Sequence, residues 1–305
     1  MTAAIYTEVA AKKEAAEASG RRVSVSGMLK YLGVSRSGYI AFLRHRPSDT
    51  ENRRHRVEKK IRKIYDDSYQ NYGAPKITHQ LREEGECISQ RTVSKYMRMM
   101  GIHAQWVKHW IPTTKNSDFS SSLHNILNEQ FNPDRPNALW CTDITYIWTY
   151  ESGYVYLTSI MDLFSRKIIA WTLTDSMDVS CVVATVNKAK DCRSTAEPLV
   201  IHSDRGSQYV SQAYQKVTKG MQRSYSKKGY PYDNACIESF HSLIKREWLN
   251  RFRIANFDAA YKLVWQYIET FYNTVRIHSH CDFMSPDDYE RLYEEVTAQN
   301  VKLVS

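Results

Sequence analysis

The strongest constraint on the fold comes from three consecutive segments rich in β-branched and aromatic residues, at 139–149 (LWCTDITYIWT), 154–162 (YVYLTSIMD) and 167–173 (KIIAWTL). Short ESG and LFSR turns separate them, which predicts an antiparallel meander of three strands. The segments expected after the meander are a helix near 178–191, a strand at 198–202, a helix near 207–219 and a short strand near 221–225. This order predicts an α/β fold with a mixed sheet and helices on its faces.

Two aspartates interrupt these apolar strands. Asp143 lies inside the first strand, in CTDIT, where an unpaired carboxylate would carry a large desolvation cost. Asp204 follows LVIHS at the end of the fourth strand, which in a mixed sheet can lie beside the first. A single Asp at a strand end more often forms a turn or caps a helix, so Asp204 needs neighbours before it indicates chemistry.

A third carboxylate, Glu238, lies in PYDNACIESFHSLIKREWL, which predicts a helix capped by Asp233 or Asn234. Lys245 follows Glu238 by two helical turns, so the two share one side of the helix. The residues expected to pack are Ile237, Phe240, Ile244 and Trp248. Carboxylates on a rigid sheet and helix are the hard oxygen ligands that a pair of Mg²⁺ ions requires, so Asp143, Asp204 and Glu238 are candidate metal ligands.

The whole chain has a formal net charge of +9, and its excess positive charge is concentrated in the first part. Residues 1–125 hold 22 Lys and Arg against 12 Asp and Glu, whereas residues 126–305 hold 20 against 21. This asymmetry indicates that the first part binds a polyanion such as nucleic acid, although a basic surface that only aids solubility is the alternative.

Residues 23–48 carry the pattern of a helix-turn-helix. Two short helical stretches flank LGVS, with Gly33 at the corner. Arg36, Ser37 and Tyr39 open the second stretch and are expected to face DNA. A helical hairpin without a DNA role is equally compatible with this segment.

A later helix, at 89–100, shows two stripes. Ser89 is its expected N-cap and Gly101 its stop. One stripe is cationic and consists of Arg91, Lys95 and Arg98, while the other is apolar and consists of Val93, Met97 and Met100. Three cations without an acid favour contact with phosphates over a merely solvated face.

The composition changes along the chain predict six segments. These are an N-terminal helix or tail (1–22), the helix-turn-helix-like segment (23–48), a helical DNA-binding domain (52–110), a linker (111–125), a catalytic core with C-terminal helices (126–292) and a tail (293–305). The six cysteines form no CxxC pair, and no apolar run approaches the ~18 residues of a membrane span, so we expect a soluble cytoplasmic protein with reduced thiols.

Four segments, CTDITY, HSDRGSQY, KKGYPYDNACIESF and YNTVRIHSHCDFMSPDDYE, resemble in order the DDE transposases of bacterial insertion sequences, in the group called IS-three. The resemblance runs from about residue 24 to 292. It implies a ribonuclease H-like, integrase-like core in which Asp143, Asp204 and Glu238 are the catalytic triad. It also implies two Mg²⁺ ions, for which Mn²⁺ can substitute, and places Lys245 on DNA near the cleavage site.

The resemblance implies an enzyme that exposes 3′-OH ends by hydrolysis and joins them to another phosphodiester. Its implied partners are the inverted-repeat ends of an insertion sequence, target DNA, further copies of the chain on DNA and the upstream-frame product, in the bacterial cytoplasm at the nucleoid. The loop before Glu238, with Lys227, Lys228 and Tyr230, combines charge and rings suited to distorted strand ends. A structure-selective nuclease and a catalytically idle DNA-binding regulator are the alternatives.

Overall fold

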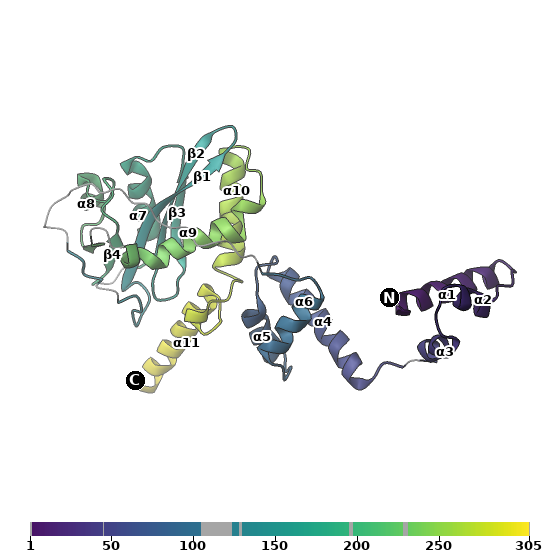
Figure 1. Cartoon of the computed structure of the whole chain (residues 1–305). Helices are drawn as coiled ribbons and strands as arrows, with labels where there is room; N and C mark the ends of the chain where they lie inside the picture. Colours follow the sequence, from purple (N-terminus) through teal and green to yellow (C-terminus); the bar gives the residue numbers. More distant parts are fainter. Residues whose placement is uncertain are drawn as a thin grey trace. The chain divides into compact units, whose positions relative to one another are not determined.

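The computed structural model describes residues 2–44, 46–104, 124–127, 130–194, 198–227 and 231–304. The chain divides into two compact units, Met1–Lys60 and Ile61–Ser305. Figure 1 labels the helices and strands along the chain. Within the described ranges, no helix is both long and apolar enough to cross a membrane. Most of the linker expected at 111–125 lies outside the described residues.

The first unit is a small helical cluster. Its helices are α1 (Thr2–Ala18), α2 (Val25–Tyr31), α3 (Arg36–Arg44) and the first part of α4 (Asp49–Asp67). Gly33 has φ +66° at the corner between α2 and α3, a conformation that glycine adopts without strain. Tyr39 is only 4% exposed and packs against Tyr6 of α1, with 5.8 Å between ring centroids. The expectation that Tyr39 faces DNA is therefore wrong, because its ring forms part of this cluster's core.

The second unit begins with the last part of α4, which two further helices follow. They are α5 (Ala74–Glu83) and α6 (Gln90–Met99). The Oγ of Ser89 accepts a hydrogen bond from the Thr92 backbone N–H, so Ser89 caps α6 as expected, and Gly101 ends it with φ +66°. Val93 and Met97 are buried while the three cations of the expected stripe are exposed. Met100, at the cap, is only half-buried.

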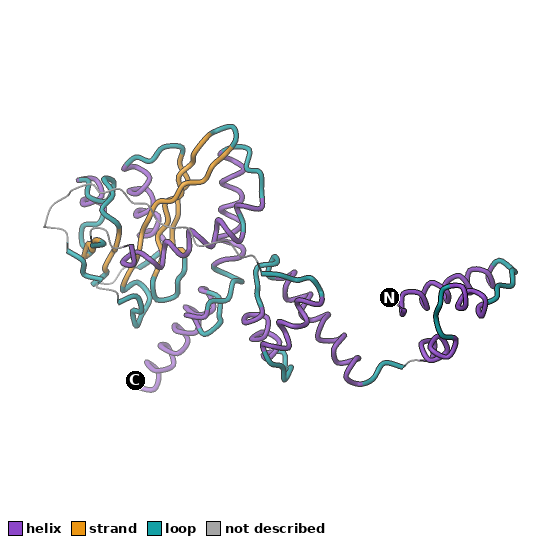
Figure 2. Tube along the Cα trace, in the orientation of Figure 1, coloured by secondary structure: helices purple, strands orange, loops and turns teal. Residues whose placement is uncertain are grey.

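A five-stranded mixed sheet forms the centre of the second unit. Its strands are β1 (Leu139–Thr149), β2 (Gly153–Asp162), β3 (Ile168–Thr174), β4 (Val200–Ser203) and β5 (Gln222–Tyr225), in the order β3-β2-β1-β4-β5. The first three strands are antiparallel, and β4 runs parallel to both β1 and β5. Figure 2 shows the long hairpin of β1 and β2 in orange. The mixed α/β sheet predicted from the sequence is confirmed.

Helices cover both faces of the sheet. Trp140 of β1 and Ile160 of β2 belong to the apolar cluster with α7 (Val179–Cys192), while Asp143 contacts α9 (Ala235–Glu247). Since side chains alternate along a strand, α7 and α9 must lie on opposite faces. Between them in sequence, α8 (Gln212–Val217) is shorter than the helix expected at 207–219, because a turn precedes its N-cap, Ser211.

The C-terminal segments pack against α9 through a buried ion pair. Arg276 Nε donates to Glu247 Oε2 at 2.7 Å and a terminal nitrogen donates to Glu247 Oε1 at 2.7 Å. The Tyr267 hydroxyl donates to Glu247 Oε2 at 2.8 Å. The remaining helical segments are η1 (Pro231–Asn234), η2 (Leu249–Arg251), α10 (Phe257–Tyr267), η3 (Ile268–Tyr272), η4 (Ser279–Cys281) and α11 (Pro286–Val304).

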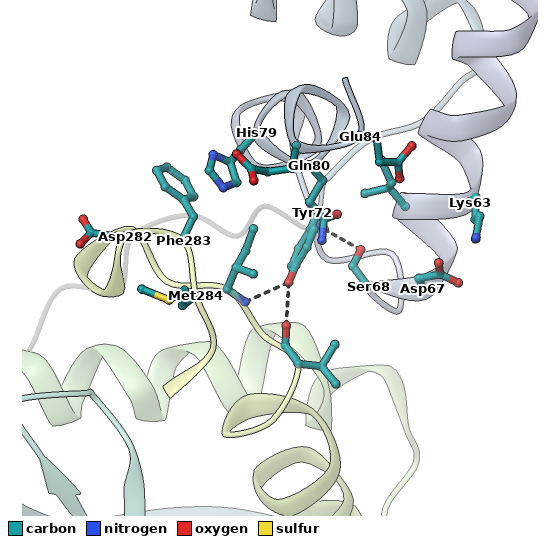
Figure 3. Close-up of a pocket in the computed structure, with 14 residues that line it drawn as sticks. Lys63, Asp67, Ser68, Tyr72, His79, Gln80, Glu84, Asp282, Phe283 and Met284 are labelled. Atoms are coloured by element: carbon teal, nitrogen blue, oxygen red, sulfur yellow. Dashed lines mark hydrogen bonds between the residues drawn. The ribbon is translucent and has the colours of Figure 1, made fainter. Parts of the chain in front are cut away.

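The helical part of the second unit contacts its C-terminal part at Tyr72, whose hydroxyl accepts from the Ile277 N–H at 3.0 Å and donates to the Val275 carbonyl at 3.4 Å (Figure 3). A pocket of about 490 Å³ lies beside this contact. It is lined by the end of α4, by α5 and by residues 275–284, among them His79 stacked on Phe283. The three candidate metal ligands are not among its lining residues.

We expect Glu247→Ala to lower the free energy of unfolding of the second unit by about 3–5 kcal/mol, because it leaves the Arg276 charge buried and unpaired. The paired variant Glu247→Leu with Arg276→Met removes both charges and should lose much less. Urea unfolding followed by tryptophan fluorescence measures both. Equal losses in the two variants would show that the unpaired Arg276 charge is not the cause of the loss.

Candidate active site

Three structural elements bring the candidate carboxylates together. Asp143 lies in the middle of β1 with a side chain that is mostly buried. The pairing of β1 with β4 ends at Cys141 and His202, and Asp204 leaves the end of β4 on the same side. Glu238 lies in the first turn of α9, the helix that packs on the Asp143 face of β1. The site therefore lies beside β1 just beyond Cys141, where β4 no longer pairs with this strand.

Crowding of like charges is evident in the acidity of these groups. Burial of the carboxyl raises the pKa of Asp204 to about 6, and the neighbouring Asp143 charge raises it as well, against a 2.9 Å hydrogen bond from the Gly206 N–H. Burial also raises the pKa of Glu238 to about 7, with added contributions from Asp143 and Asp204. Both side chains are open to solvent on one side, so the carboxyl groups are desolvated by protein but accessible to a ligand.

The donor set fits divalent cations. All three groups offer hard oxygen atoms, and a cation among them would offset the like-charge repulsion that adds to burial in raising the pKa values of Asp204 and Glu238. Within the described ranges, no three His, Cys, Asp or Glu side chains are gathered closely enough to ligate one ion. Two ions shared among three carboxylates do not require one ion to contact all three, so this spacing is compatible with a two-ion site.

His241 is a fourth member of the site that the sequence analysis missed. Its Nδ1 lies 3.3 Å from Asp143 Oδ2, and the side chain is almost fully buried. Its Nε2 has no hydrogen-bond partner among the described residues. The Nδ1 contact packs the imidazole against the Asp143 carboxylate, so His241 is positioned to orient this carboxylate. Its position three residues after Glu238 was the available signal.

Lys245 lies at the edge of the same site. Its Nζ is 4.6 Å from the centroid of the Tyr146 ring, a cation–π contact that the sequence analysis did not foresee. Burial lowers the pKa of Lys245, while the Asp143 charge raises it, which places the ammonium within electrostatic reach of the carboxylates. A cation here is suited to hold an anionic substrate beside them.

The structure describes five other positively charged residues of the sequence-predicted sites. Arg36 is exposed on α3 in the first unit, and Arg91, Lys95 and Arg98 are exposed on α6. Lys227 is exposed after β5. Lys228 and Tyr230 lie outside the described residues.

Neither Asp233 nor Asn234 caps α9 with its side chain, contrary to expectation. Asn234 occupies the N-cap position, but its side chain makes no capping hydrogen bond. Asp233 does not cap the helix either, because its Oδ2 accepts from the Lys227 N–H at 2.7 Å. Asp233 therefore closes the loop before α9 and ties it to the end of β5.

Comparison with known protein families finds three matching regions. Residues 133–231 and residues 219–286 each match a family described as Integrase core domain. Residues 52–110 match a family described as HTH-like domain.

Individual proteins also resemble the chain. It is 36% identical over 251 residues to a transposase for insertion sequence element IS904 of Lactococcus lactis, covering 82% of this chain and 99% of that protein. It is 32% identical over 271 residues to transposase InsF for insertion sequence IS3A of Escherichia coli, covering 88% and 94%. The HTLV-2 integrase catalytic core domain aligns with 52% of this chain and 98% of its own, at 18% identity and a TM-score of 0.40.

We expect His241→Leu to weaken Mn²⁺ binding by about 10- to 100-fold, because a partner that orients a ligating carboxylate is lost. His241→Asn keeps a donor near the position of Nδ1 and should retain most of the affinity. Electron paramagnetic resonance of free Mn²⁺ measures binding without any reaction. Equal affinity in both variants and the native chain would show that His241 only fills space.

Proposed function

The chain belongs to the transposases of bacterial insertion sequences in the IS-three (IS3) group, and from this membership we propose that Asp143, Asp204 and Glu238 catalyse its DNA cleavage and joining. The protein is a DNA transposase with an integrase core and an HTH-like domain. The nuclease and idle-regulator alternatives are not favoured, since the relatives that match over most of the chain are transposases.

One observation carries the assignment of the triad. The Asp143 charge acts on both Asp204 and Glu238, so carboxylates from a strand, a strand end and a helix lie within electrostatic reach of one another. Structural carboxylates are usually held by a cation or by several hydrogen bonds, as Glu247 is by Arg276 and Tyr267. The triad instead places like charges near one another at a solvent-accessible edge of the sheet. This arrangement lowers stability, and a functional role accounts for it.

We propose that the triad holds two Mg²⁺ ions, for which Mn²⁺ can substitute. When bound, such ions would stabilise negative charge on the attacking and leaving oxygens of the phosphodiester. The residues of the chain supply the positioning. Asp143 is fixed by the ladder of β1 and by His241, Asp204 by the Gly206 N–H, and Glu238 by the first turn of α9.

Lys245 binds the phosphate next to the reacting bond in this proposal. Its partial burial strengthens its attraction for an anion, because fewer water molecules compete for the ammonium. Water first attacks the phosphorus at the cleavage site and breaks its bond to the 3′-oxygen, which frees a 3′-OH end. That 3′-OH then attacks a second phosphodiester, forming a new P–O bond while the 3′-oxygen of the attacked strand leaves as a hydroxyl. Holding both DNA strands on rigid elements lowers the entropic part of each barrier.

DNA recognition falls to other surfaces. We propose that Arg91, Lys95 and Arg98 on the exposed face of α6 contact phosphates, since α6 lies in the region that matches the HTH-like domain. Arg36 and the loop with Lys227, Lys228 and Tyr230 are further proposed contacts. The proposed partners are inverted-repeat ends, target DNA, further copies of the chain on DNA and the upstream-frame product, at the nucleoid of the bacterial cytoplasm.

The variants Asp143→Asn, Asp204→Asn and Glu238→Gln should each lower cleavage and joining by at least about 100-fold, because each keeps the side-chain shape and loses the charge needed at the reacting centre. Thermal stability in metal-free buffer should stay equal or rise, since repulsion is relieved. Asp175→Asn, which alters an exposed acid after β3, is the matched control and should retain activity. Near-native cutting by any triad variant removes that residue from the assignment.

A further inference from the structure

The outer end of the β1–β2 hairpin extends beyond the rest of the sheet (Figure 1). Pairing of β2 with β3 ends at Tyr156, and pairing of β1 with β4 ends at Cys141, so the hairpin continues as a two-stranded ribbon. The Tyr150 N–H donates to the Ile254 carbonyl at 3.1 Å and the Glu151 N–H to the Ala255 carbonyl at 2.8 Å. These bonds fix the ribbon to the segment before α10, so its side chains are held in place.

Four aromatic side chains lie on this ribbon, and each is between 50% and 60% exposed. Trp148 and Tyr154 are cross-strand partners with ring centroids 4.8 Å apart, and Tyr146 lies 5.4 Å from Tyr154. Tyr150 completes the group, which we call the aromatic ribbon (Tyr146, Trp148, Tyr150 and Tyr154). A cluster of exposed rings on a rigid element indicates an interaction site.

Two cations border the aromatic ribbon. Lys245 Nζ lies 4.6 Å from the Tyr146 ring centroid, and the Arg253 guanidinium lies 4.5 Å from the Tyr150 ring centroid. Tyr146 is three residues after Asp143 in the same strand, and Lys245 is on the helix that carries Glu238. Side chains alternate along β1, so Tyr146 leaves the face opposite to Asp143. Lys245 links the two, because its ammonium contacts the Tyr146 ring and lies within electrostatic reach of Asp143. A ligand on the ribbon would therefore adjoin the candidate active site at Lys245.

We propose that the aromatic ribbon binds unpaired bases of the DNA strand next to the cleaved phosphodiester. Bases stack on the rings while Lys245 and Arg253 hold the flanking phosphates, the combination that binds single strands without sequence preference. Side chains two residues apart on a strand are about 6.8 Å apart, twice the 3.4 Å step of stacked bases in a duplex, so Tyr146 and Trp148 suit bases already withdrawn from the stack. This inference rests on the proposed function only in placing the cleaved bond at the triad.

A second copy of the chain is a less suitable occupant. A symmetric contact through this face would place Lys245 and Arg253 near their own counterparts, so like charges would be buried together. The one acid at the turn, Glu151, already accepts a 3.0 Å hydrogen bond from Asn256 Nδ2. The charge on this face therefore favours a polyanion.

Trp148→Ala in the full chain tests the proposal, with Trp265→Ala as the matched control, because Trp148 is 53% and Trp265, on α10, is 46% exposed. Fluorescence anisotropy measures the affinity for a duplex with an unpaired overhang and for a blunt duplex. Trp148→Ala should weaken overhang binding by about 5- to 100-fold and leave blunt-duplex binding unchanged. Trp265→Ala should change neither.

Tyr154→Ser is the second variant, and it should show the same selective loss if the ribbon acts as one surface. Equal effects of Trp148→Ala and Trp265→Ala would overturn the proposal. So would unchanged overhang binding together with an altered sedimentation coefficient, which would identify a protein interface instead. Because binding needs no cleavage, failure here is distinct from failure of the triad, which would appear as cutting by Asp204→Asn.

Discussion

The placement of Asp143, Asp204 and Glu238 near one another is the constraint on which the proposed chemistry depends, since burial and the neighbouring charges raise the pKa values of Asp204 and Glu238. Each carboxylate is carried by an element with its own anchorage: a strand paired over its whole length with β2, the end of a parallel strand, and a helix on one face of the sheet. Apolar packing on the α7 face supplies stability that offsets this unfavourable site.

The distribution of charge along the chain separates the proposed DNA-binding surface from the carboxylates. Excess positive charge lies before residue 126, where α6 presents three cations, while the core is nearly neutral and carries the acids. Lys245 and Arg253 are core cations that contact exposed rings. DNA can thus be held along a cationic helical surface and by the ribbon, with only the reacting bond brought to the carboxylates.

Much of the sheet was predictable, because β-branched and aromatic runs between short turns mark the strands within one residue at β1, β2 and β3. The sequence also singles out Asp143, because an acid inside an apolar strand is unusual, while Asp204 and Glu238 are singled out by their motifs. The role of the three carboxylates as metal ligands stays a prediction. Contacts between segments that are distant in the sequence were not predictable. The packing of Tyr39 on α1, the bond from Lys227 to Asp233 and the approach of His241 to Asp143 depend on tertiary geometry that local periodicity does not contain.

Anomalous diffraction from crystals of the chain with bound DNA and Mn²⁺ tests the central claim most directly. The account predicts two manganese peaks about 4 Å apart among Asp143, Asp204 and Glu238. Manganese bound at other groups, or a single ion that leaves one of the three carboxylates without a metal contact, would contradict it.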